Sequence, residues 1–277
     1  MNSKKVDLHL HSNCSDGAYS PSELVAKLAA SGLSAFALTD HDTIGGLDEA
    51  AEAAVKCGID FVPGIEISVV EETREIHILG YYPVKLQLLE DNLVELRNQR
   101  FFRMERTVHL LKKHGFNITE SEVLAEAGQA APGRMHLASV LMRKNYVRSI
   151  EEAFKHYLGF NKPAYVQRKT LSLPETIRLL VDCQAVPVFA HPGAEGLKIV
   201  KSMVPLGLKG VEAFHPDHSN KVVRQALLLA AEQGLLITGG SDYHGSSEML
   251  SPYPIEKAID YSYLEQLKTL IGSGGTS

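Results

Sequence analysis

Short apolar segments alternate along this chain with longer stretches of helical periodicity. Val, Ile, Phe and Ala dominate seven segments that we predict to be strands: Val6–Leu10, Ala35–Thr39, Phe61–Ile67, Ile76–Tyr81, Val186–Ala190, Gly210–Phe214 and Leu235–Thr238. Two intervening helices are well marked: Pro21 begins one and Gly32 follows it, while the other covers Leu173–Gln184. This alternation predicts an α/β fold with a parallel sheet, either a closed barrel or an open doubly wound sheet.

The pattern changes between the fourth and fifth predicted strands, where only helical segments occur. These segments are Leu86–Gly115, Glu120–Ala127, Arg134–Asn145 and Ser149–Tyr157. We interpret residues 84–169 as a helical insertion that caps a barrel built from residues 1–83 and 170–277. The insertion carries 15 Lys and Arg against 9 Asp and Glu, whereas the rest of the chain carries 13 against 24. This division favours cations in the acidic body and an anion facing the insertion, although an ordinary solvated helix surface gives the same count.

Composition narrows the class of protein. The chain has 277 residues, of which 44% are hydrophobic and 22% charged, and this is typical of a globular protein rather than a disordered one. No apolar run reaches the roughly 18 residues of a membrane span, and Met1–Lys5 leads straight into the first predicted strand. The three cysteines, Cys14, Cys57 and Cys183, predict neither a disulfide framework nor a cysteine zinc site. We therefore expect a cytoplasmic protein without a membrane partner.

Side chains that bind metals occur at or near the end of almost every predicted strand. His9 and His11 close the first strand and project to the same side, and Asp7 shares their face, where it can hold a ring N–H. The later strands carry His41 between Asp40 and Asp42, then Glu66, His77, His191, Glu212, His215, Asp242 and His244. A buried histidine or a helix-capping aspartate explains any single one of these, but not their repetition. Because parallel α/β folds build active sites at the carboxyl ends of strands, we predict a metal centre there.

The ligand types indicate the chemistry. Imidazole and carboxylate without thiolate favour Mn²⁺, Fe²⁺ or Zn²⁺ over Ca²⁺, and the number of ligands indicates more than one ion. Two ions about 3.5 to 4 Å apart can share a bridging hydroxide and clamp the attacking and leaving oxygens of a phosphoryl transfer. The chain has no GxSxG, no P-loop and no GxGxxG, and Cys14 lacks a supporting signature. We therefore expect hydrolysis by metal-activated water.

Six motifs resemble, in order, those of the PHP superfamily, named for polymerase and histidinol phosphatase: DLHLHS followed by SDG, TDHDT, GIEIS, EIHILGY, AHPG and SDYHG. The match spans almost the whole chain, and the resemblance implies a distorted seven-stranded (β/α) barrel with three adjacent metal positions. It implies the ligand sets His9, His11, Glu66 and Asp242; Glu66, His77 and His191; and Asp16, His41 and His244. Two or three Mn²⁺ ions are the expected cofactor, with Zn²⁺, Fe²⁺ and Mg²⁺ as alternatives. Asp40 and Asp42 are expected to orient ligands rather than to bind ions.

Within the superfamily, the insertion and the segment PGRMHLA resemble the branch of nucleoside 3′,5′-bisphosphate phosphatases, whose relatives include 5′-3′ exoribonucleases of the RNase AM type. Arg134 and His136 lie near the start of a predicted helix, where a guanidinium and backbone amides favour phosphate. An exposed arginine and histidine are the alternative interpretation. The resemblance also places His215 and His218 near the substrate, as phosphate contacts or as the proton donor to the leaving oxygen. Glu66, Asp242 and His218 are thus the expected catalytic residues.

Other features of the insertion have simpler interpretations. Arginines recur at every third residue from Arg97 to Arg106, so they spiral around about half of the predicted helix. We expect an ordinary solvated surface there, with phosphate steering by one or two of them, Arg100 or Arg103, as the alternative. Phe101 and Phe102 are expected in the core rather than under a nucleobase.

Together these patterns predict a metal-dependent phosphoesterase that hydrolyses a phosphate from nucleoside 3′,5′-bisphosphates and degrades short RNA from the 5′ end. Three alternatives stay open: an amidohydrolase-type hydrolase, which also begins with HxH, a histidinol-phosphate-type phosphatase, and a metal-stabilised regulatory module without turnover. The set of Asp16, His41 and His244 has no obvious use in an amidohydrolase site. The expected partners are a small nucleotide substrate and short RNA, and the oligomeric state is not predicted.

Overall fold

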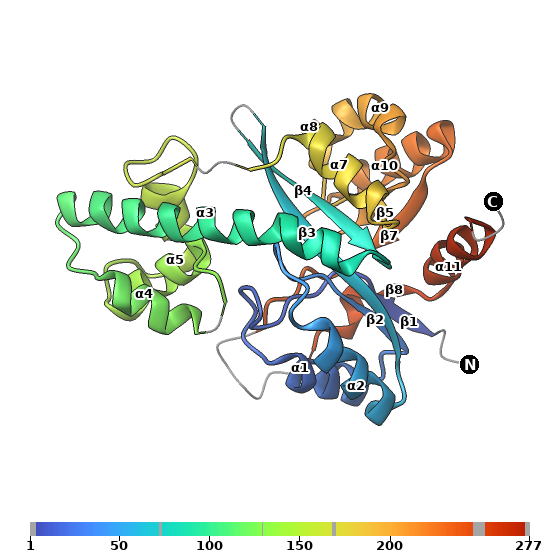
Figure 1. Cartoon of the computed structure of the whole chain (residues 1–277), viewed down its shortest axis with the longest axis horizontal. Coiled ribbons are helices and arrows are strands. Elements are labelled where there is room, and N and C mark those ends of the chain that lie inside the picture. The colour runs from blue at the N-terminus through green and yellow to red at the C-terminus, as the bar shows by residue number, and fades with distance from the viewer. Residues whose placement is uncertain (1–3, 72–73, 129, 168–169, 246–252, 275–277) are drawn as a thin grey trace.

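Eight strands form one mixed sheet that curves into a nearly closed barrel (Figure 1). The computed structural model describes residues 4–71, 74–128, 130–167, 170–245 and 253–274. The strands are β1 (Lys5–Asp7), β2 (Ala35–Leu38), β3 (Asp60–Glu71), β4 (Arg74–Tyr81), β5 (Val186–Phe189), β6 (Gly210–Phe214), β7 (Leu236–Gly239) and β8 (Ile259–Asp260), in the order β7-β6-β5-β4-β3-β2-β1-β8. The predicted count of seven missed β8, whose two residues are too few to produce an alternating pattern.

The prediction of a parallel sheet was wrong at β4, the fourth predicted strand, and the unpredicted β8 is antiparallel as well. β4 runs antiparallel to both β3 and β5, and β8 runs antiparallel to β1, whereas the other neighbouring pairs are parallel. Only two residues separate β3 from β4, and a parallel crossover needs roughly a dozen or more. The reversal also explains why His77, which pairs with Ser68, lies in the middle of its strand and still reaches the carboxyl ends of the parallel strands.

The segment that follows β1 forms hydrogen bonds with β7 and with the segment that follows β7, and these contacts nearly close the barrel. The amide of Leu8 donates to the carbonyl of Gly239 at 3.2 Å, and the amide of Asp242 donates to the carbonyl of His9 at 3.0 Å. A β-carbon on Gly240 would lie 2.4 Å from the Cβ of His9, so this close approach requires glycine. Strand β1 ends at Asp7, earlier than predicted, and its two histidines lie in the segment that follows.

Helices cover the sheet and enclose its core. They are α1 (Pro21–Ala30), α2 (Leu47–Cys57), α7 (Leu173–Asp182), α8 (Gly193–Gly196), α9 (Val200–Met203), α10 (Asn220–Gln233) and α11 (Ser262–Gly274). Ser20 and Ser172 cap α1 and α7 in the reciprocal arrangement with Glu23 and Glu175 that the Ser-x-x-Glu spacing favours. One apolar cluster draws on strands β1 to β5 and is completed by side chains of α11. None of the described helices is long and apolar enough to cross a membrane.

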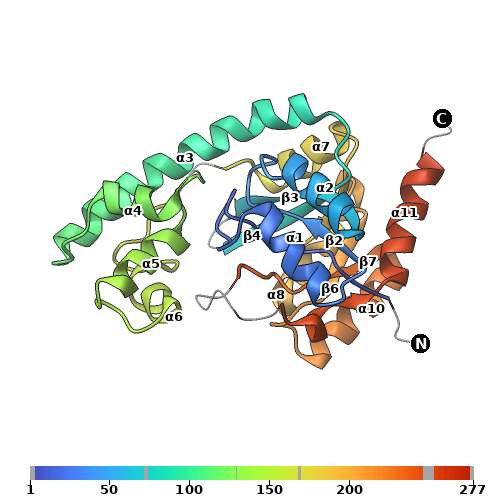
Figure 2. The same cartoon turned by 90° about the horizontal axis from the view of Figure 1, so that it is seen from below.

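The chain between β4 and α7 leaves the barrel along one long helix. That helix is α3 (Leu86–Lys113), and α4 (Glu120–Ala127), α5 (Arg134–Arg143), α6 (Ile150–Ala153) and a π-helix (Phe154–Leu158) follow it. Figures 1 and 2 show α3 extending away from the sheet with α4 and α5 beside its outer half. A separate apolar cluster, which includes Met104, Val123 and Leu141, holds these helices together.

Candidate metal centre

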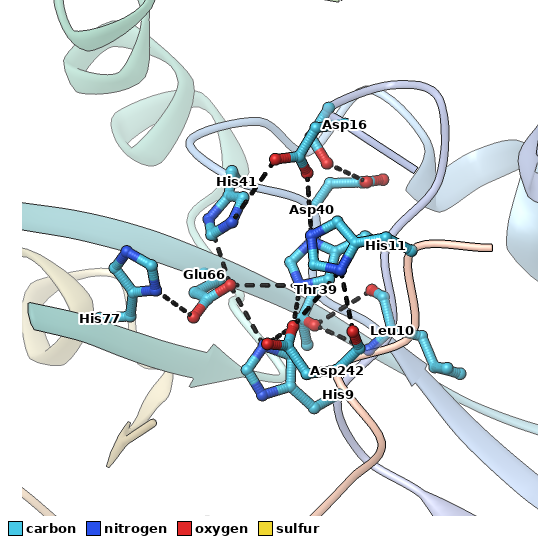
Figure 3. A network of polar contacts seen from close by, with 12 residues as sticks. His9, Leu10, His11, Asp16, Thr39, Asp40, His41, Glu66, His77 and Asp242 are labelled. Atoms are coloured by element: carbon cyan, nitrogen blue, oxygen red, sulfur yellow. Dashed lines mark hydrogen bonds and ion pairs between the residues drawn. The ribbon is translucent and has the colours of Figure 1, made fainter. Parts of the chain in front are cut away.

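One buried carboxylate lies at the centre of five imidazole rings, and those of His9, His11, His41 and His77 are drawn in Figure 3. Glu66 comes from β3, and its Oε2 lies 3.1 Å from the Nε2 of His9, 3.2 Å from the Nε2 of His11 and 3.1 Å from the Nδ1 of His41. Its Oε1 lies 2.9 Å from the Nδ1 of His77 and 3.2 Å from the Nε2 of His191. The side chain of Glu66 is fully buried, so these rings replace water around it.

Two further carboxylates extend the cluster on either side. Asp242 Oδ1 lies 3.0 Å from His11 Nε2 and 3.4 Å from His9 Nε2. Asp16 approaches a different edge, where its Oδ1 lies 3.2 Å from the Nε2 of His244 and its Oδ2 3.9 Å from the Nε2 of His41. The predicted ligands therefore meet in one place, although they come from both halves of the barrel.

The cluster divides into overlapping groups whose potential ligand atoms all lie within 4.8 Å of one another. These groups are His9, His11, Glu66 and Asp242; His11, Asp16, His41 and His244; and His41, Glu66 and His77. The first is the set that the family resemblance implies. Each of the other two groups contains one ring that the resemblance assigns to a neighbouring set. This ring is His11 in the group with Asp16 and His244, and His41 in the group with Glu66 and His77. His191 lies beside the last group, where its Nε2 is 3.3 Å from the Nδ1 of His77.

The chemistry of these atoms fits divalent cations. Several buried ligand atoms form no hydrogen bond within the part of the chain that the structure describes: His9 Nε2, both ring nitrogens of His11, Asp16 Oδ1, His41 Nδ1 and Glu66 Oε2. Buried polar groups in native proteins are normally hydrogen-bonded, so a set of orphaned atoms that face one another calls for a ligand. Neutral imidazole nitrogens beside carboxylate oxygens are donors that Mn²⁺, Fe²⁺ and Zn²⁺ accept.

Burial and the neighbouring charges have opposite effects on these groups. Burial lowers the pKa of His11, but the carboxylates beside it outweigh burial and raise the pKa to about 10. At His41 burial dominates, and the pKa falls to about 3. Burial alone would raise the pKa of Glu66, yet the charges of the surrounding imidazoles hold it well below its usual range. Without ions, protons therefore occupy part of the cluster, and they must leave before a metal binds.

Neighbouring carboxylates hold the backbone that carries the cluster. Asp40 accepts hydrogen bonds from the amide of Ser12 at 2.7 Å and from the Ser12 and Ser15 hydroxyls at 2.6 Å, which fixes the loop before Asp16. A β-carbon on Gly17 would lie 2.3 Å from the carbonyl oxygen of His11, so only glycine allows this loop to fold so closely. Asp40 thus holds the backbone beside Asp16, and its role in orienting a metal ligand stays a prediction.

Asp7 acts differently from its prediction. Its carboxylate accepts from the amides of His9 at 3.0 Å and Ser241 at 3.1 Å and from the hydroxyl of Tyr253, and it holds no ring N–H. The reason is the closure of the barrel, which places the amides after β7 against the Asp7 side chain. Asp7 therefore fastens β1 to β7.

Left-handed backbone marks three residues of the site. Asp42, His191 and Asp242 have φ values of 53°, 24° and 53°, a conformation that residues with a β-carbon seldom adopt. Such residues persist only where the surroundings hold them, and they cluster at functional sites.

Comparison with known proteins gives the family. The PHP domain model matches residues 7–166, more than half of the 277-residue chain. The chain belongs to the PHP family.

Relatives and a solved structure agree with this assignment. A 3′,5′-nucleoside bisphosphate phosphatase of Chromobacterium violaceum is 32% identical over 252 residues, which cover 88% of each chain. A 5′-3′ exoribonuclease of Haemophilus influenzae is 34% identical over 87% of this chain and 90% of that protein. A structure from Bifidobacterium adolescentis, assigned as a metal-dependent phosphoesterase, is 29% identical and superposes with a TM-score of 0.86 over 95% of both chains. The predicted PHP family and the prediction of a phosphoester-hydrolysing enzyme are confirmed.

Arg134 and His136, two of the residues predicted to bind substrate, lie at the rim of this PHP centre rather than inside it. Arg134 forms an ion pair with Glu75, whose Oε1 lies 4.0 Å from the Nε2 of His77. Its guanidinium also lies 5.4 Å from the centroid of the Phe154 ring. His136 is buried, and its Nδ1 accepts the amide proton of Gly133 at 2.9 Å, while burial lowers the pKa of His136. A single acidic side chain thus separates Arg134 from the metal cluster.

The two histidines after β6 differ in their surroundings. The Nε2 of His215 lies 3.4 Å from Asp242 Oδ2, so His215 joins the cluster. In His218 the Nδ1 donates to the carbonyl of Ala213 at 2.9 Å, and the Nε2 accepts the amide proton of Gly193 at 3.1 Å. Both ring nitrogens of His218 are therefore engaged by backbone groups.

Two predictions about α3 were wrong. Arg97 and Arg100 face the barrel rather than solvent: Arg97 donates to the carbonyl of Asp42, and the Arg100 Nη2 lies 2.6 Å from Asp42 Oδ2. Arg103 is buried, with its guanidinium 5.6 Å from the Tyr165 ring centroid. The cause is that this helix packs across the loop after β2, where Arg100 neutralises a fully buried carboxylate.

The other error concerns the aromatic pair on α3. Phe101 and Phe102 are 40% and 60% exposed instead of buried. They precede Met104 and Val108, which do face the apolar cluster, and they point to other sides of α3.

Glu212 is the main residue that the predicted site omitted. Its position at the end of β6 was apparent from the sequence, but nothing in the spacing distinguished it from an ordinary buried acid. In the structure it contacts His9 and His191.

Proposed function

We propose that the protein is a metal-dependent phosphoesterase that removes a phosphate from nucleoside 3′,5′-bisphosphates and shortens short RNA from its 5′ end. The observation that carries this proposal is the convergence on Glu66 of imidazoles and carboxylates with buried, unsatisfied ligand atoms. The names of the two relatives, which align over most of this chain, support the choice of substrate.

The proposed metal ligands follow the three groups. His9, His11, Glu66 and Asp242 would hold one ion, Glu66, His77 and His191 a second, and Asp16, His41 and His244 a third. We propose Mn²⁺ as the resident ion. Such ions, when bound, supply a water of lowered pKa and positive charge that neutralises a phosphate.

The rim residues would bind and orient the substrate. Through its guanidinium, Arg134 would bind the phosphate that is not cleaved. His136 would contact the same phosphate through its Nε2. Glu75 already pairs with Arg134, so the phosphate takes the place of a carboxylate rather than entering a vacant position.

We assign the proton donor for the leaving oxygen to His215. Burial lowers the pKa of His215, but the Asp242 carboxylate outweighs it and raises the pKa above its usual value, which keeps a proton on the ring. His218 was the expected donor, and its engaged nitrogens give it the role of fixing the backbone around Gly193 and Ala213 instead.

The insertion at residues 84–169 would serve as a cap that selects the substrate. Its separate apolar cluster and its contacts toward the centre, among them Arg100 with Asp42 and Arg134 with Glu75, support this division. The remainder of the chain, residues 1–83 and 170–277, would form the metal-binding barrel.

A direct test combines elemental analysis of protein purified without oxygen with a panel of substrates. We expect two or three Mn²⁺ per chain, and release of inorganic phosphate from adenosine 3′,5′-bisphosphate at least about tenfold faster than from histidinol phosphate. A 5′-phosphorylated short RNA should lose nucleotides from its 5′ end in the same assay.

Other outcomes would contradict the proposal. Faster cleavage of histidinol phosphate would change the substrate class, and release of ammonia or a carboxylate product from amide substrates would indicate an amidohydrolase. A protein that melts at a higher temperature with Mn²⁺ but hydrolyses nothing would be a regulatory module.

A further inference from the structure

Glu212 is a fully buried carboxylate that the proposed ligand sets do not use. It lies on β6, and its Oε1 and Oε2 are 3.0 and 3.2 Å from the Nδ1 of His9. Its Oε2 also accepts the backbone amide proton of His191 at 2.8 Å. The Glu212 side chain therefore contacts two residues that are distant in sequence, His9 after β1 and His191 after β5.

The first contact determines which nitrogen of His9 faces the ions. A carboxylate accepts but does not donate, so the Nδ1 of His9 carries the proton in this contact. The Nε2 then has its lone pair free, and it points toward Glu66 Oε2 at 3.1 Å and Asp242 Oδ1 at 3.4 Å. Histidines that ligate metals typically donate their other ring N–H to such a partner.

The second contact fixes the backbone of His191. This residue has a φ of 24°, and its amide would lose a hydrogen bond if Glu212 were absent. The imidazole that this backbone directs into the cluster lies 3.2 Å from Glu66 Oε1. Glu212 thus acts on a proposed ligand of the second ion as well as on one of the first.

We infer that Glu212 is a positioning residue that couples two metal positions, because it sets the ring orientation of His9 and the backbone of His191 together. The position of Asp16, His41 and His244 lacks a described contact with Glu212 and is independent of it. The inference rests on the proposed function only in that metals occupy the site.

The substitution Glu212→Gln tests this role at nearly constant size. The glutamine oxygen can still accept from one donor, but its NH₂ group cannot accept from the other. Either His9 exposes a protonated Nε2 to the ions or the amide of His191 is left without its partner. We expect Mn²⁺ affinity at two positions to fall about 10- to 100-fold, with one ion retained.

Thr238→Val is the matched control. Thr238 pairs with Glu212 in the β6–β7 register and is also fully buried, so its replacement perturbs the same level of the barrel. We expect the control to retain the wild-type Mn²⁺ stoichiometry by elemental analysis and the wild-type affinity by calorimetry. Loss of metal in both variants to the same extent, or in neither, would overturn the inference.

A second measurement applies even where Glu212→Gln does not fold. Nitrogen-15 spectra of histidine-labelled, zinc-loaded wild-type protein distinguish a ring bound through Nε2 from one bound through Nδ1. The inference requires Nε2 ligation with a protonated Nδ1 at His9, and Nδ1 ligation would contradict it. Neither readout depends on turnover, so a wild type that binds metals without cleaving phosphoesters would refute the proposed function and leave this inference standing.

Discussion

The buried acids near the centre fall into two kinds. Glu66, Asp242 and Asp16 contact ring nitrogens that face one another, and they are the proposed ligands. Asp7 and Asp40 are fully or almost fully buried and accept hydrogen bonds from backbone amides and hydroxyls. What separates the two kinds is the donors that the folded chain brings to each carboxylate, since all five follow or lie on strands.

Arg134→Ala tests the proposed phosphate contact at the rim. Removing the guanidinium should lower kcat/KM for nucleoside bisphosphates at least about tenfold, because one charge-assisted contact is worth roughly that much. Metal content should stay at the wild-type level, because Glu75, with which Arg134 forms its ion pair, is not among the proposed ligands. Steady-state kinetics and elemental analysis measure the two effects.

Arg143→Ala is the control for this variant. Arg143 lies on the same helix, α5, but its side chain is 55% exposed and pairs with Glu126. Unchanged kinetics in Arg134→Ala, or an equal loss in both variants, would remove the assigned role of Arg134.

At the scale of elements, α3 connects the helical segment to the metal centre. Arg100 forms two hydrogen bonds with Asp42, which is fully buried and adjacent in sequence to His41. Asp42 also accepts the amide proton of Ser68 at 2.9 Å, so it joins α3 to β3. The arginine is therefore part of the packing between these elements.

We predict that Arg100→Ala lowers the free energy of unfolding by about 3 kcal/mol, because it removes the guanidinium that neutralises the buried carboxylate of Asp42. Urea unfolding of the metal-free protein measures this change. Arg106→Ala, on the exposed side of the same helix, should stay within about 0.5 kcal/mol of wild type. A salt-dependent loss of kcat/KM in Arg100→Ala without loss of stability would favour phosphate steering instead.

The elements also show how far sequence patterns reach. Strands such as β2 and β5 were predicted almost to the residue because both of their faces are buried and their apolar runs are continuous. The direction of β4 was not predicted, because the hydrophobic pattern of a strand does not encode its orientation. Phe101 and Phe102 were misplaced because an apolar residue within a helix is not always on its buried face. The convergence of the proposed ligands was predictable because the carboxyl ends of parallel strands meet at one edge of a sheet, whereas the partners of Glu212 depend on side-chain geometry.

For the whole molecule, stability and metal binding should respond oppositely to pH. The pKa of His11 is raised from 6.5 to about 10 in the folded metal-free protein, so its contribution to stability is complete below pH 6.5 and is lost as the pH rises toward 10. The melting temperature of the metal-free protein should therefore fall across this window. Mn²⁺ competes with the same protons, so the increase in melting temperature that Mn²⁺ gives should become larger as the pH rises.

Differential scanning fluorimetry between pH about 6.5 and about 9.5, with and without Mn²⁺, measures both trends. His11→Asn should flatten the decline of the metal-free protein, because it removes the titrating ring. A wild-type melting temperature that rises with pH in the absence of metal would contradict the assignment.

The amide of Asp242 donates to the carbonyl of His9, and both residues belong to the first proposed metal group. During translation, residue 242 must therefore leave the ribosome before this group has its full set of donors. A nascent chain halted anywhere short of residue 242 lacks one carboxylate and the partner for the segment after β1. Products that terminate before this residue would consequently be unable to assemble the first group.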